Sequence, residues 1–404
     1  MRILFADALP LEFLARLTTA GHEYEVRPEL TAEDLPEAVG GFDALVVRST
    51  KVHAATITAA DELELIVRAG AGTNNIDVQA AADAGVAVCN VPGKNAIAVA
   101  ELTLGLLLSA DRHIADGVLA LREGRWDKKA FSDARGLYGR QLGIVGLGEI
   151  GLAVAGRAKA FGMQVVSVRN PGRSQAMERR IRSIGIRLVD DLDELLASSD
   201  VVSLHVPSTD ETRAMVDAAF LAKMRDGAVL INTSRGDLLD EDAVLAALDS
   251  GRLTVALDVW PDEPTVAKGD FRSPLASHPR VVGTHHIGAS TAQAQEAVAS
   301  GTIDVITAYA SGEMEFCVNM AERVHDSCTI AVRHLDRVGV LASVLAVLRS
   351  NGLNVGQMRN QIFQGSNAAV ATIDIYGQLT DGAIEDIAAL DNVIGVSADK
   401  SITE

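Results

Sequence analysis

Several residues that could carry acid–base chemistry follow apolar runs in the second half of the chain. Arg235 lies in the segment NTSRG, Glu263 in DVWPDEP, and two adjacent histidines, His285 and His286, in THHIG. A histidine gives and takes a proton near neutral pH, and a carboxylate behind it fixes its tautomer. An arginine binds a carboxylate group. This set of residue types suits hydride transfer to a keto acid, which needs a cation, a proton donor and a group that orients the donor.

The residues alone do not decide which histidine would act. Adjacent residues of an extended segment face opposite sides, so one of His285 and His286 would face a cleft and the other would not. Each polar residue taken singly could also be a structural group. Their joint placement after successive strands favours a site, because ligands bind at the carboxyl ends of strands in open α/β sheets.

A glycine-rich turn predicts a dinucleotide site. The segment GLGEIG places Gly146, Gly148 and Gly151 between an apolar run and a helical pattern. In this fingerprint the first glycine permits the tight turn, the second lets the backbone approach a pyrophosphate, and the third lets helix and strand pack closely. The helix N-terminus then favours the phosphate charge.

The end of the next strand departs from the simplest form of this site. An acidic residue usually binds the ribose hydroxyls there, but the segment VVSVRNPGRS has Arg169 in that place and Arg173 nearby. An arginine can pair with the extra 2′-phosphate of NADP, although both could also be solvated loop charges. We expect NAD or NADP as cofactor, with Arg169 favouring NADP.

The elements that must position these residues alternate between strands and helices, which predicts parallel sheets. The predicted strands are Arg2–Asp7, Ala44–Arg48, Leu63–Ala71, Val86–Val91, Leu142–Gly146, Val165–Val168, Val201–Val206, Ala228–Asn232, Thr254–Asp258 and Val281–Thr284. One long amphipathic helix is expected from Asn95, as its N-cap, to about Glu123, and another from after Ser290 to about Tyr309. A linker without a clear period runs from Ala310 to about His325.

The last 80 or so residues change pattern. The predicted order is a strand, a helix from after Asp336 to Gly352, two strands, a second helix and a last strand near Val396. The strands before the last are Cys328–Leu335, Val355–Phe363 and Ala369–Tyr376, and the second helix is Asp381–Ala389. This β-α-β-β-α-β order is typical of the ferredoxin-like fold.

Composition narrows the function classes. The formal net charge is −18 and the pI about 4.9, which disfavours binding to nucleic acid or to an anionic membrane surface. Three cysteines without metal-ligand spacing favour reduced thiols and no metal site. No apolar run reaches the roughly 20 residues of a membrane span, and the first residues show no signal-peptide pattern. We therefore expect a cytoplasmic protein.

The motifs together resemble those of the D-isomer-specific 2-hydroxyacid dehydrogenase family. The resemblance covers nearly the first 315 residues, through GAGTNNID, GLGEIG, HVPSTDET, NTSRG, DVWPDEP and THHIGAST. It implies that Arg235 binds the substrate carboxylate and carbonyl, that Glu263 orients the acid–base group, and that His286 is that group. The family writes the last motif as TPHIG, so His285 falls on its proline.

The resemblance also implies the domains and the remaining contacts. We expect a flavodoxin-like substrate domain (1–94 and 287–315), a Rossmann cofactor domain (95–286) and a C-terminal domain (326–404) that resembles ACT regulatory domains. The implied cofactor contacts are Gly146, Gly148, Glu149, Ile150, Gly151, Arg169, Asn170, His205, Val206, Pro207, Thr212, Thr233, Ser234, Asp258 and Gly288, with Asp258 on the nicotinamide amide. For a small phosphorylated hydroxy or keto acid, the implied contacts are Arg48, Ser49, Ala71, Gly72, Asn95 and Lys128.

The C-terminal domain would bind an amino acid such as L-serine through His334, Asp336 and Asn354. Asp336 stands where the serine-binding pattern has asparagine, and Val338 where it has proline. The resemblance further suggests a homodimer or homotetramer. Two alternatives stay open: a hydroxypyruvate or glyoxylate reductase that uses NADPH, and a regulator that senses a dinucleotide without turning it over.

Overall fold

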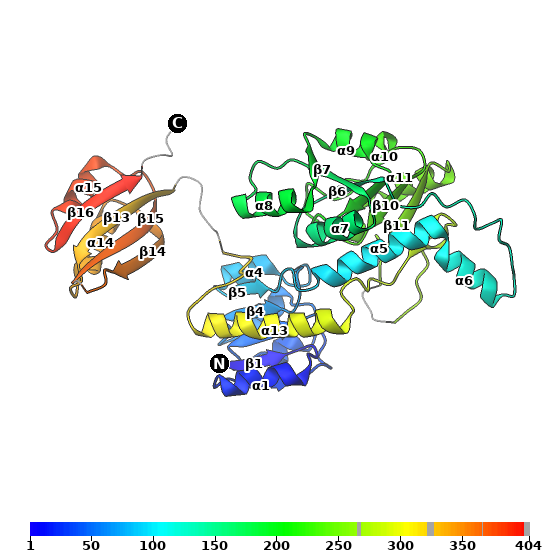
Figure 1. Cartoon of the computed structure of the whole chain (residues 1–404). Helices are drawn as coiled ribbons and strands as arrows, with labels where there is room; N and C mark the ends of the chain where they lie inside the picture. Colours follow the sequence, from blue (N-terminus) through cyan, green and yellow to red (C-terminus); the bar gives the residue numbers. More distant parts are fainter. Residues whose placement is uncertain (265–267, 321–326, 366, 400–404) are drawn as a thin grey trace. The chain divides into compact units, whose positions relative to one another are not determined.

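The computed structural model describes residues 1–264, 268–320, 327–365 and 367–399. These residues form two compact units, Met1–Asn319 and Met320–Glu404 (Figure 1). The expected first residue of the C-terminal domain, at position 326, and the last five residues of the chain lie outside the described ranges. Each unit is considered by itself.

The first sheet has five parallel strands in the order β2-β1-β3-β4-β5, which is the flavodoxin-like order. Its strands are β1 (Arg2–Phe5), β2 (Glu23–Val26), β3 (Ala44–Val47), β4 (Leu65–Arg68) and β5 (Ala87–Asn90). Its helices are α1 (Leu11–Thr19), α2 (Leu35–Ala38), α3 (Ala54–Ala59), α4 (Val78–Asp83) and α13 (Ala292–Ala310). The edge strand β2 was not predicted, because its sequence EYEV mixes charged and apolar residues.

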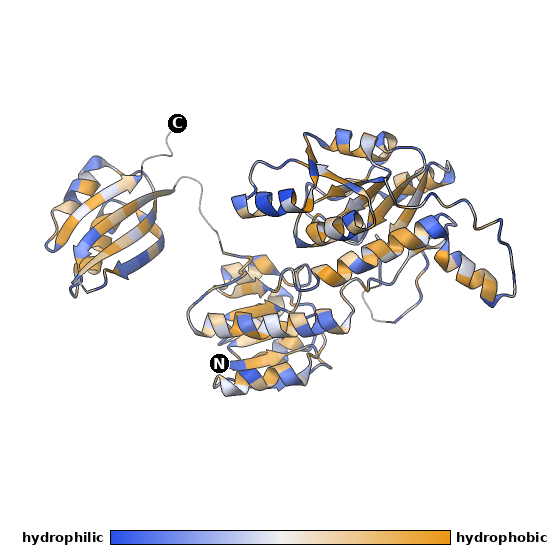
Figure 2. Cartoon of the chain, viewed as in Figure 1, coloured by the Kyte–Doolittle hydropathy of each residue, from blue (hydrophilic) through white to orange (hydrophobic). Residues whose placement is uncertain are grey.

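Helices cover both faces of this sheet, so successive strand residues are all apolar. Ile3 and Phe5 pack with α1 and with α13, which returns from far along the chain. Leu4 points to the opposite face, where it packs with residues of α2 and α4. Burial on both faces explains why the strands are continuous hydrophobic runs (Figure 2).

The second sheet has seven parallel strands in the order β12-β11-β10-β9-β6-β7-β8, which confirms the Rossmann arrangement. Its strands are β6 (Gln141–Val145), β7 (Gln164–Val168), β8 (Arg187–Val189), β9 (Val201–Leu204), β10 (Ala228–Asn232), β11 (Leu253–Leu257) and β12 (Val281–Gly283). The helices around it are α5 (Ala96–Arg112), α6 (Ile114–Arg122), α7 (Glu149–Ala160), α8 (Gln175–Ile184), α9 (Leu192–Ser198), α10 (Ala218–Lys223), η1 (Gly236–Leu238), α11 (Glu241–Asp249) and α12 (Pro274–Ser277). The three-residue edge strand β8 was not predicted.

The predicted single helix from Asn95 to Glu123 is wrong: two helices, α5 and α6, occupy this stretch. They meet at His113, whose φ of 51° is left-handed. A left-handed residue ends the ladder of helical hydrogen bonds, and the amide of His113 donates to the carbonyl of Ser109. The amphipathic pattern continues across the break, so periodicity alone could not reveal it.

The C-terminal unit has the predicted ferredoxin-like order. Its antiparallel sheet runs β14-β15-β13-β16, and its elements are β13 (Ser327–Leu335), α14 (Val340–Ser350), β14 (Asn354–Ile362), β15 (Ala368–Tyr376), α15 (Asp381–Ala388) and β16 (Val393–Asp399). Ile330, Val332 and Ile373 of the sheet pack against Val344 and Leu348 of α14.

Part of the segment after α13, which the sequence predicts as a linker without a clear period, pairs with the first sheet. Cys317 forms an antiparallel bridge with Cys89 at the edge of β5. The amide of Asn90 donates to the carbonyl of Phe316 at 3.1 Å, and the Val318 amide donates to the Val88 carbonyl at 2.8 Å. A segment of four residues is too short to show a strand period, so it left no signal in the sequence.

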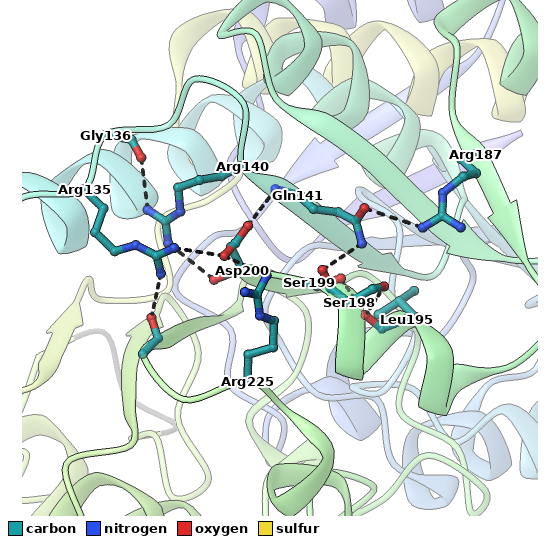
Figure 3. Close-up of polar contacts among 11 residues, drawn as sticks. Arg135, Gly136, Arg140, Gln141, Arg187, Leu195, Ser198, Ser199, Asp200 and Arg225 are labelled. Atoms are coloured by element: carbon teal, nitrogen blue, oxygen red, sulfur yellow. Dashed lines mark hydrogen bonds and ion pairs between the residues drawn. The ribbon is translucent and has the colours of Figure 1, made fainter.

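A polar network around Asp200 ties the segment before β6 to the opposite end of the second sheet from the glycine-rich turn (Figure 3). The carboxylate accepts hydrogen bonds from Arg135 at 3.0 Å, Arg225 at 3.1 Å and the Gln141 amide at 3.0 Å. Burial raises the pKa of Asp200, but these donors lower the pKa by a larger amount, so the net shift is downward. Arg140 lies alongside and forms a buried ion pair with Asp111 at 2.7 Å.

We predict that Asp200→Ala lowers the free energy of unfolding by about 1–3 kcal/mol, because the buried Gln141 amide loses its acceptor. Urea unfolding followed by circular dichroism measures the change. Because the folded pKa of Asp200 is depressed, its contribution is present above about pH 4 and is lost as the pH falls through that depressed value.

The matched control is Asp193→Ala, which removes an exposed ion pair with Lys223. This change should cost less than about 1 kcal/mol. Equal losses in the two variants at neutral pH would contradict a special role for the network.

Candidate active site

The carboxylate of Asp258 anchors the turn that carries the two histidines. It is 1% exposed and follows β11. Its Oδ1 accepts hydrogen bonds from Thr284 Oγ1 at 2.6 Å and from the Ile287 amide at 2.8 Å, and its Oδ2 accepts from the Gly288 amide at 2.8 Å. A Cβ at Gly288 would lie 2.9 Å from Oδ2, so glycine permits this approach. Asp258 thus fixes the turn.

His286 is held at the centre of this turn in a rare backbone conformation. Its φ is 53°, and its amide donates to the Asp258 carbonyl at 2.7 Å. Non-glycine residues seldom adopt positive φ, and such strain concentrates at functional sites. Its Nδ1 lies 2.7 Å from Glu263 Oε1, which leaves Nε2 free to face a substrate. His285 also lines the cleft, but the structure brings the carboxylate to His286.

The contact between His286 and Glu263 shifts the pKa of each residue in the direction that suits proton transfer. The hydrogen bond that His286 donates to Glu263 raises the pKa of His286, against the effect of burial. Burial raises the pKa of Glu263, but the hydrogen bond and charge of His286 outweigh it, so the carboxyl pKa is lowered overall. Glu263 therefore stays ionised and stabilises the imidazolium form of its partner.

Arg235 is presented by a turn whose polar side chains are used internally. Asn232 donates from Nδ2 to the Arg235 carbonyl at 2.7 Å, and Ser234 Oγ donates to the Leu204 carbonyl at 2.6 Å. The guanidinium lies against the backbone of Gly72, where a Cβ would stand 2.2 Å from Nη2. Its charge acts on both Glu263 and His286. The three predicted catalytic residues are thus brought together.

A cleft of about 1150 Å³ opens beside these residues, lined from both sheets of the first unit. Arg48 and Arg68, from the ends of β3 and β4, line it with His286 and Glu263. The charges of Arg235 and Arg48 reach Arg68, and burial together with these two charges lowers the pKa of Arg68 to about 10. A concentration of cations in a protein of net charge −18 indicates an anion site.

Two residues of this cleft were missed by the sequence analysis. Arg68 ends an apolar strand, and an arginine there was a signal that could have been used. Its Nε is buried without a partner among the described residues. Asp7 follows β1, and its Oδ2 accepts hydrogen bonds from the amides of Arg48, Ser49 and Thr50, at 2.7, 3.1 and 3.1 Å. Asp7 thereby holds the loop that presents Arg48.

The other predicted substrate contacts have different positions. Ser49 and Asn95 line the cleft, whereas Ala71 stands beside it and accepts from Asn90 Nδ2 at 2.6 Å. Asn95 precedes α5, as predicted, but makes no side-chain capping bond with the described residues; its buried Oδ1 has no partner there. Lys128 is not brought to the cleft, because it lines a separate pocket with α6 and Trp126. The sequence could not show that the loop carrying Lys128 lies away from the cleft.

The glycine-rich turn has the space that a dinucleotide requires. Gly146 has a φ of 100°, and a Cβ there would meet the His205 carbonyl oxygen at 2.5 Å. A Cβ at Gly151 would meet the Gly146 carbonyl oxygen at 2.2 Å. Around Gly148 no described atom lies within 4 Å of the Cβ position, so open space remains at the N-terminus of α7. These three environments fit the roles that the fingerprint assigns.

Further predicted cofactor residues surround this turn. Burial lowers the pKa of His205 to about 3, so its ring is neutral at physiological pH, and its Nδ1 has no partner among the residues described. Val206 and Pro207 follow directly, and Thr212 Oγ1 donates to the Pro207 carbonyl at 2.7 Å. A buried ring nitrogen without a partner can form a hydrogen bond with a polar group of a bound cofactor.

The remaining cofactor candidates have partners within the chain. Thr233 Oγ1 lies 3.1 Å from Thr103 Oγ1, in the interior. Glu149 forms a two-point ion pair with Arg180, at 2.5 and 2.9 Å. Ile150 packs against the core of the second sheet. These contacts support the turn and the start of α7.

Cationic groups gather after β7, as the sequence predicts. Arg169 is 57% exposed and lies 3.5 Å from Asp190, a pair too exposed and too long to hold it firmly. Asn170 Oδ1 accepts from the Gly172 amide at 3.0 Å. Arg173 donates from Nη2 to the Val168 carbonyl at 2.9 Å, while its buried Nη1 has no partner in the described part of the chain.

The predicted effector residues of the C-terminal unit are not brought together within one copy. His334 is buried, with Nδ1 2.8 Å from the Leu335 carbonyl and Nε2 3.1 Å from Asn360 Oδ1. Asp336 follows it and is exposed. Asn354 begins β14 at the opposite end of the sheet, roughly 20 Å away by strand register. His334 therefore supports the fold of this unit.

Neither a membrane-spanning helix nor a cluster of metal ligands is present among the described residues. No helix among them is long and apolar enough to cross a membrane. No three histidine, cysteine or acidic side chains among them are grouped as metal ligands would be.

Comparison with known proteins identifies the class. Residues 104–288 match the family model of the D-isomer specific 2-hydroxyacid dehydrogenase, NAD binding domain. A hydroxypyruvate reductase of Thermotoga maritima is 43% identical over 70% of this chain and 90% of its own length. The chain belongs to the D-isomer-specific 2-hydroxyacid dehydrogenase family, and the matched NAD-binding domain confirms the expected cofactor class, NAD or NADP.

Relatives that extend further carry another name. The D-3-phosphoglycerate dehydrogenase of Methanocaldococcus jannaschii is 41% identical over 79% of this chain, which spans 60% of that protein's length. The enzyme of the same name from Mycobacterium tuberculosis is 36% identical over 99% of this chain and 74% of its own length. Among solved structures, the TT0316 protein of Thermus thermophilus has a TM-score of 0.68 and 34% identity, covering 79% of this chain and all of that chain.

We predict that Glu263→Gln lowers the pKa of His286, because the amide cannot stabilise the imidazolium and burial then dominates. Titration of the histidine ring signals by NMR measures the shift. In the parent protein the raised pKa of His286 means that its pairing with Glu263 stabilises the fold fully below about pH 6.5, as long as Glu263 is ionised, and that this contribution is lost as the pH rises through the folded value.

A second histidine–carboxylate pair provides the control. Asp249 lies 3.5 Å from His278, so Asp249→Asn should leave the pKa of His286 unchanged. An unaltered His286 titration in Glu263→Gln would show that the hydrogen bond does not control this ionisation.

Proposed function

We propose that this protein is a D-3-phosphoglycerate dehydrogenase, which transfers a hydride reversibly between 3-phosphoglycerate or 3-phosphohydroxypyruvate and a nicotinamide cofactor. The observation that carries the proposal is the group of three arginines, Arg48, Arg68 and Arg235, beside His286. One arginine suffices for the carboxylate of a simple keto acid. The other two provide positive charge for a phosphate, and the proposed step would serve L-serine synthesis.

The roles of the residues follow from their positions. Arg235 would hold the substrate carboxylate and polarise the carbonyl, while Arg48 and Arg68 would bind the phosphate. His286 would give its Nε2 proton to the carbonyl oxygen during reduction and take it back during oxidation. Glu263 would stabilise the imidazolium. The bound nicotinamide would supply or accept the hydride at the substrate carbon.

The proposal predicts fast oxidation of reduced cofactor with 3-phosphohydroxypyruvate and much slower oxidation with unphosphorylated hydroxypyruvate, followed by nicotinamide absorbance. His286→Ala should lower kcat by roughly 10²–10⁴-fold, the range for a positioned acid–base group. Cofactor affinity, measured by fluorescence titration, should not change. His285→Ala is the matched control and should keep most of the activity.

The alternative activities give different results in the same assay. Equal rates with and without the substrate phosphate would favour a hydroxypyruvate or glyoxylate reductase, which the Thermotoga relative supports by name. Cofactor binding without turnover of any keto acid would favour a dinucleotide-sensing regulator. A near-normal rate in His286→Ala would refute its assigned role.

We further propose that the cofactor site favours NADP over NAD. Arg169 stands where an acidic residue would bind the ribose hydroxyls, and its ion pair with Asp190 is weak enough to be exchanged for a phosphate. Asp190→Asn would then strengthen NADPH binding by removing the competing charge. The nearby unpartnered Nη1 of Arg173 adds positive charge to the same loop.

The prediction is that Arg169→Asp weakens the binding of NADPH relative to that of NADH by about 10-fold or more, since hydrogen bonds to charged groups contribute about 1.5–3 kcal/mol to binding. Fluorescence titration gives both dissociation constants, and competition by adenosine 2′,5′-bisphosphate isolates the phosphate. Arg187→Asp makes the same charge change on β8 and should leave the ratio unchanged. An unaltered ratio in Arg169→Asp would refute the NADP preference without affecting the proposed reaction.

We also propose two partners. A homodimer or homotetramer is supported by α6, where the apolar residues Ile114, Leu119 and Leu121 are about half exposed (Figure 2). Regulation by L-serine or another amino acid is supported by the ferredoxin-like C-terminal unit. Because Asn354 lies far from His334 and Asp336 in one chain, one copy would offer such a ligand only some of these residues.

A further inference from the structure

Two cysteines outside the active site face each other across paired backbones. Cys89 lies in β5 and Cys317 in the segment that follows α13, and they form an antiparallel bridge. The two flanking hydrogen bonds, Asn90 to Phe316 and Val318 to Val88, make the cysteines a non-hydrogen-bonded pair. In such pairs the Cα atoms lie about 4.5 Å apart and the side chains are close.

This geometry meets the requirements of a disulfide. The Cα separation of a non-hydrogen-bonded pair falls at the short end of the range that disulfides span, about 4.4–6.8 Å. The two thiols are close enough for each to influence the other's ionisation, and Cys317 Sγ lies 3.2 Å from Asn319 Oδ1. Cys317 is only partly buried, and disulfides that solvent can reach are more readily reduced than buried ones. The site thus suits a reversible bond better than a permanent one.

The two thiols differ in access, which sets the order of reaction. Cys89 is 1% exposed, and burial, with its thiol neighbour, raises its pKa to about 12. Cys317 is half-buried and is the thiol that a solute can reach. Cys328, the third cysteine, belongs to the other compact unit and has no part in the pair.

We propose that Cys89 and Cys317 form a reversible disulfide that fastens residues 316–319 to β5. The oxidant is a low-molecular-weight disulfide, RSSR. The Cys317 thiolate attacks one sulfur, the S–S bond of RSSR breaks, and one RSH leaves after taking a proton. Cys89 then loses its proton to solvent and attacks Cys317 Sγ, which releases the second RSH. Two protein thiols are oxidised and one RSSR is reduced to two thiols.

The bond would restrain the end of the first unit at its sheet. Asn319 already binds this edge, since its Oδ1 accepts from the Val88 amide at 2.9 Å and its Nδ2 donates to the Val86 carbonyl at 2.8 Å. Cross-linking also closes a long loop, from position 89 to position 317, and so restricts the unfolded chain. We therefore expect the oxidised protein to unfold several degrees higher than the reduced protein.

The test treats the full chain with oxidised glutathione, blocks the remaining thiols with N-ethylmaleimide at low pH and analyses peptides without reductant. The expected result is one linked pair of peptides containing Cys89 and Cys317, with Cys328 alkylated, and loss of the link on adding dithiothreitol. Hydrogen exchange at the Val318 amide should slow in the oxidised form.

Two variants separate the proposal from general thiol oxidation. Cys328→Ser should form the same link, and Cys317→Ser should leave Cys89 unmodified. If Cys317 keeps glutathione without linking to Cys89, or if both cysteines stay alkylated while Cys328 becomes glutathionylated, the proposal is wrong. The wild-type peptide result does not depend on how either variant folds.

Discussion

The site depends on one buried carboxylate. Asp258 is almost fully removed from water, and an ionised group in that position is tolerated because three donors of a single turn satisfy it. The same three bonds hold His286 at a positive φ, which few sequences would adopt without such support. Glu263 follows five residues after Asp258 on the same segment, so the histidine and its partner are positioned by one short stretch of chain. The precision of the acid–base pair is therefore a property of the end of β11.

The cleft carries positive charge, whereas the whole protein is negatively charged. A chain of net charge −18 places Arg48 and Arg235 close enough to Arg68 for their charges to act on it. Repulsion between these cations and the burial of Arg68 are unfavourable, and a bound anion would offset both costs. Asp7 offsets part of the repulsion and also shapes the loop that carries Arg48. The charges of the cleft thus favour an anion.

The fold could be predicted from the sequence for two reasons. Burial on both sides of a parallel sheet leaves continuous apolar runs, and the glycine spacing is specific to a strand–turn–helix of the dinucleotide-binding type. The edge strands β2 and β8 were missed because they are partly exposed to solvent, so their sequences contain too few apolar residues to predict a strand. The predicted catalytic residues came from motif positions, whereas Arg68 and Asp7 were missed because their contacts arise between strands far apart in sequence. The same reason explains why Lys128 and Asn354 were grouped with their predicted partners. Within one folded chain Lys128 does not line the cleft, and Asn354 does not lie near His334.

The bridge between residues 316–319 and β5 also protects an edge. A strand at the margin of a sheet presents free amide and carbonyl groups that invite pairing with other chains. Here the chain covers its own β5 with backbone hydrogen bonds and with the Asn319 amide, while the opposite edge, β2, is short and carries Glu23 and Glu25. A chain shortened just after α13 would uncover this margin and become prone to sheet-to-sheet association, even though every residue of the active site would remain in place.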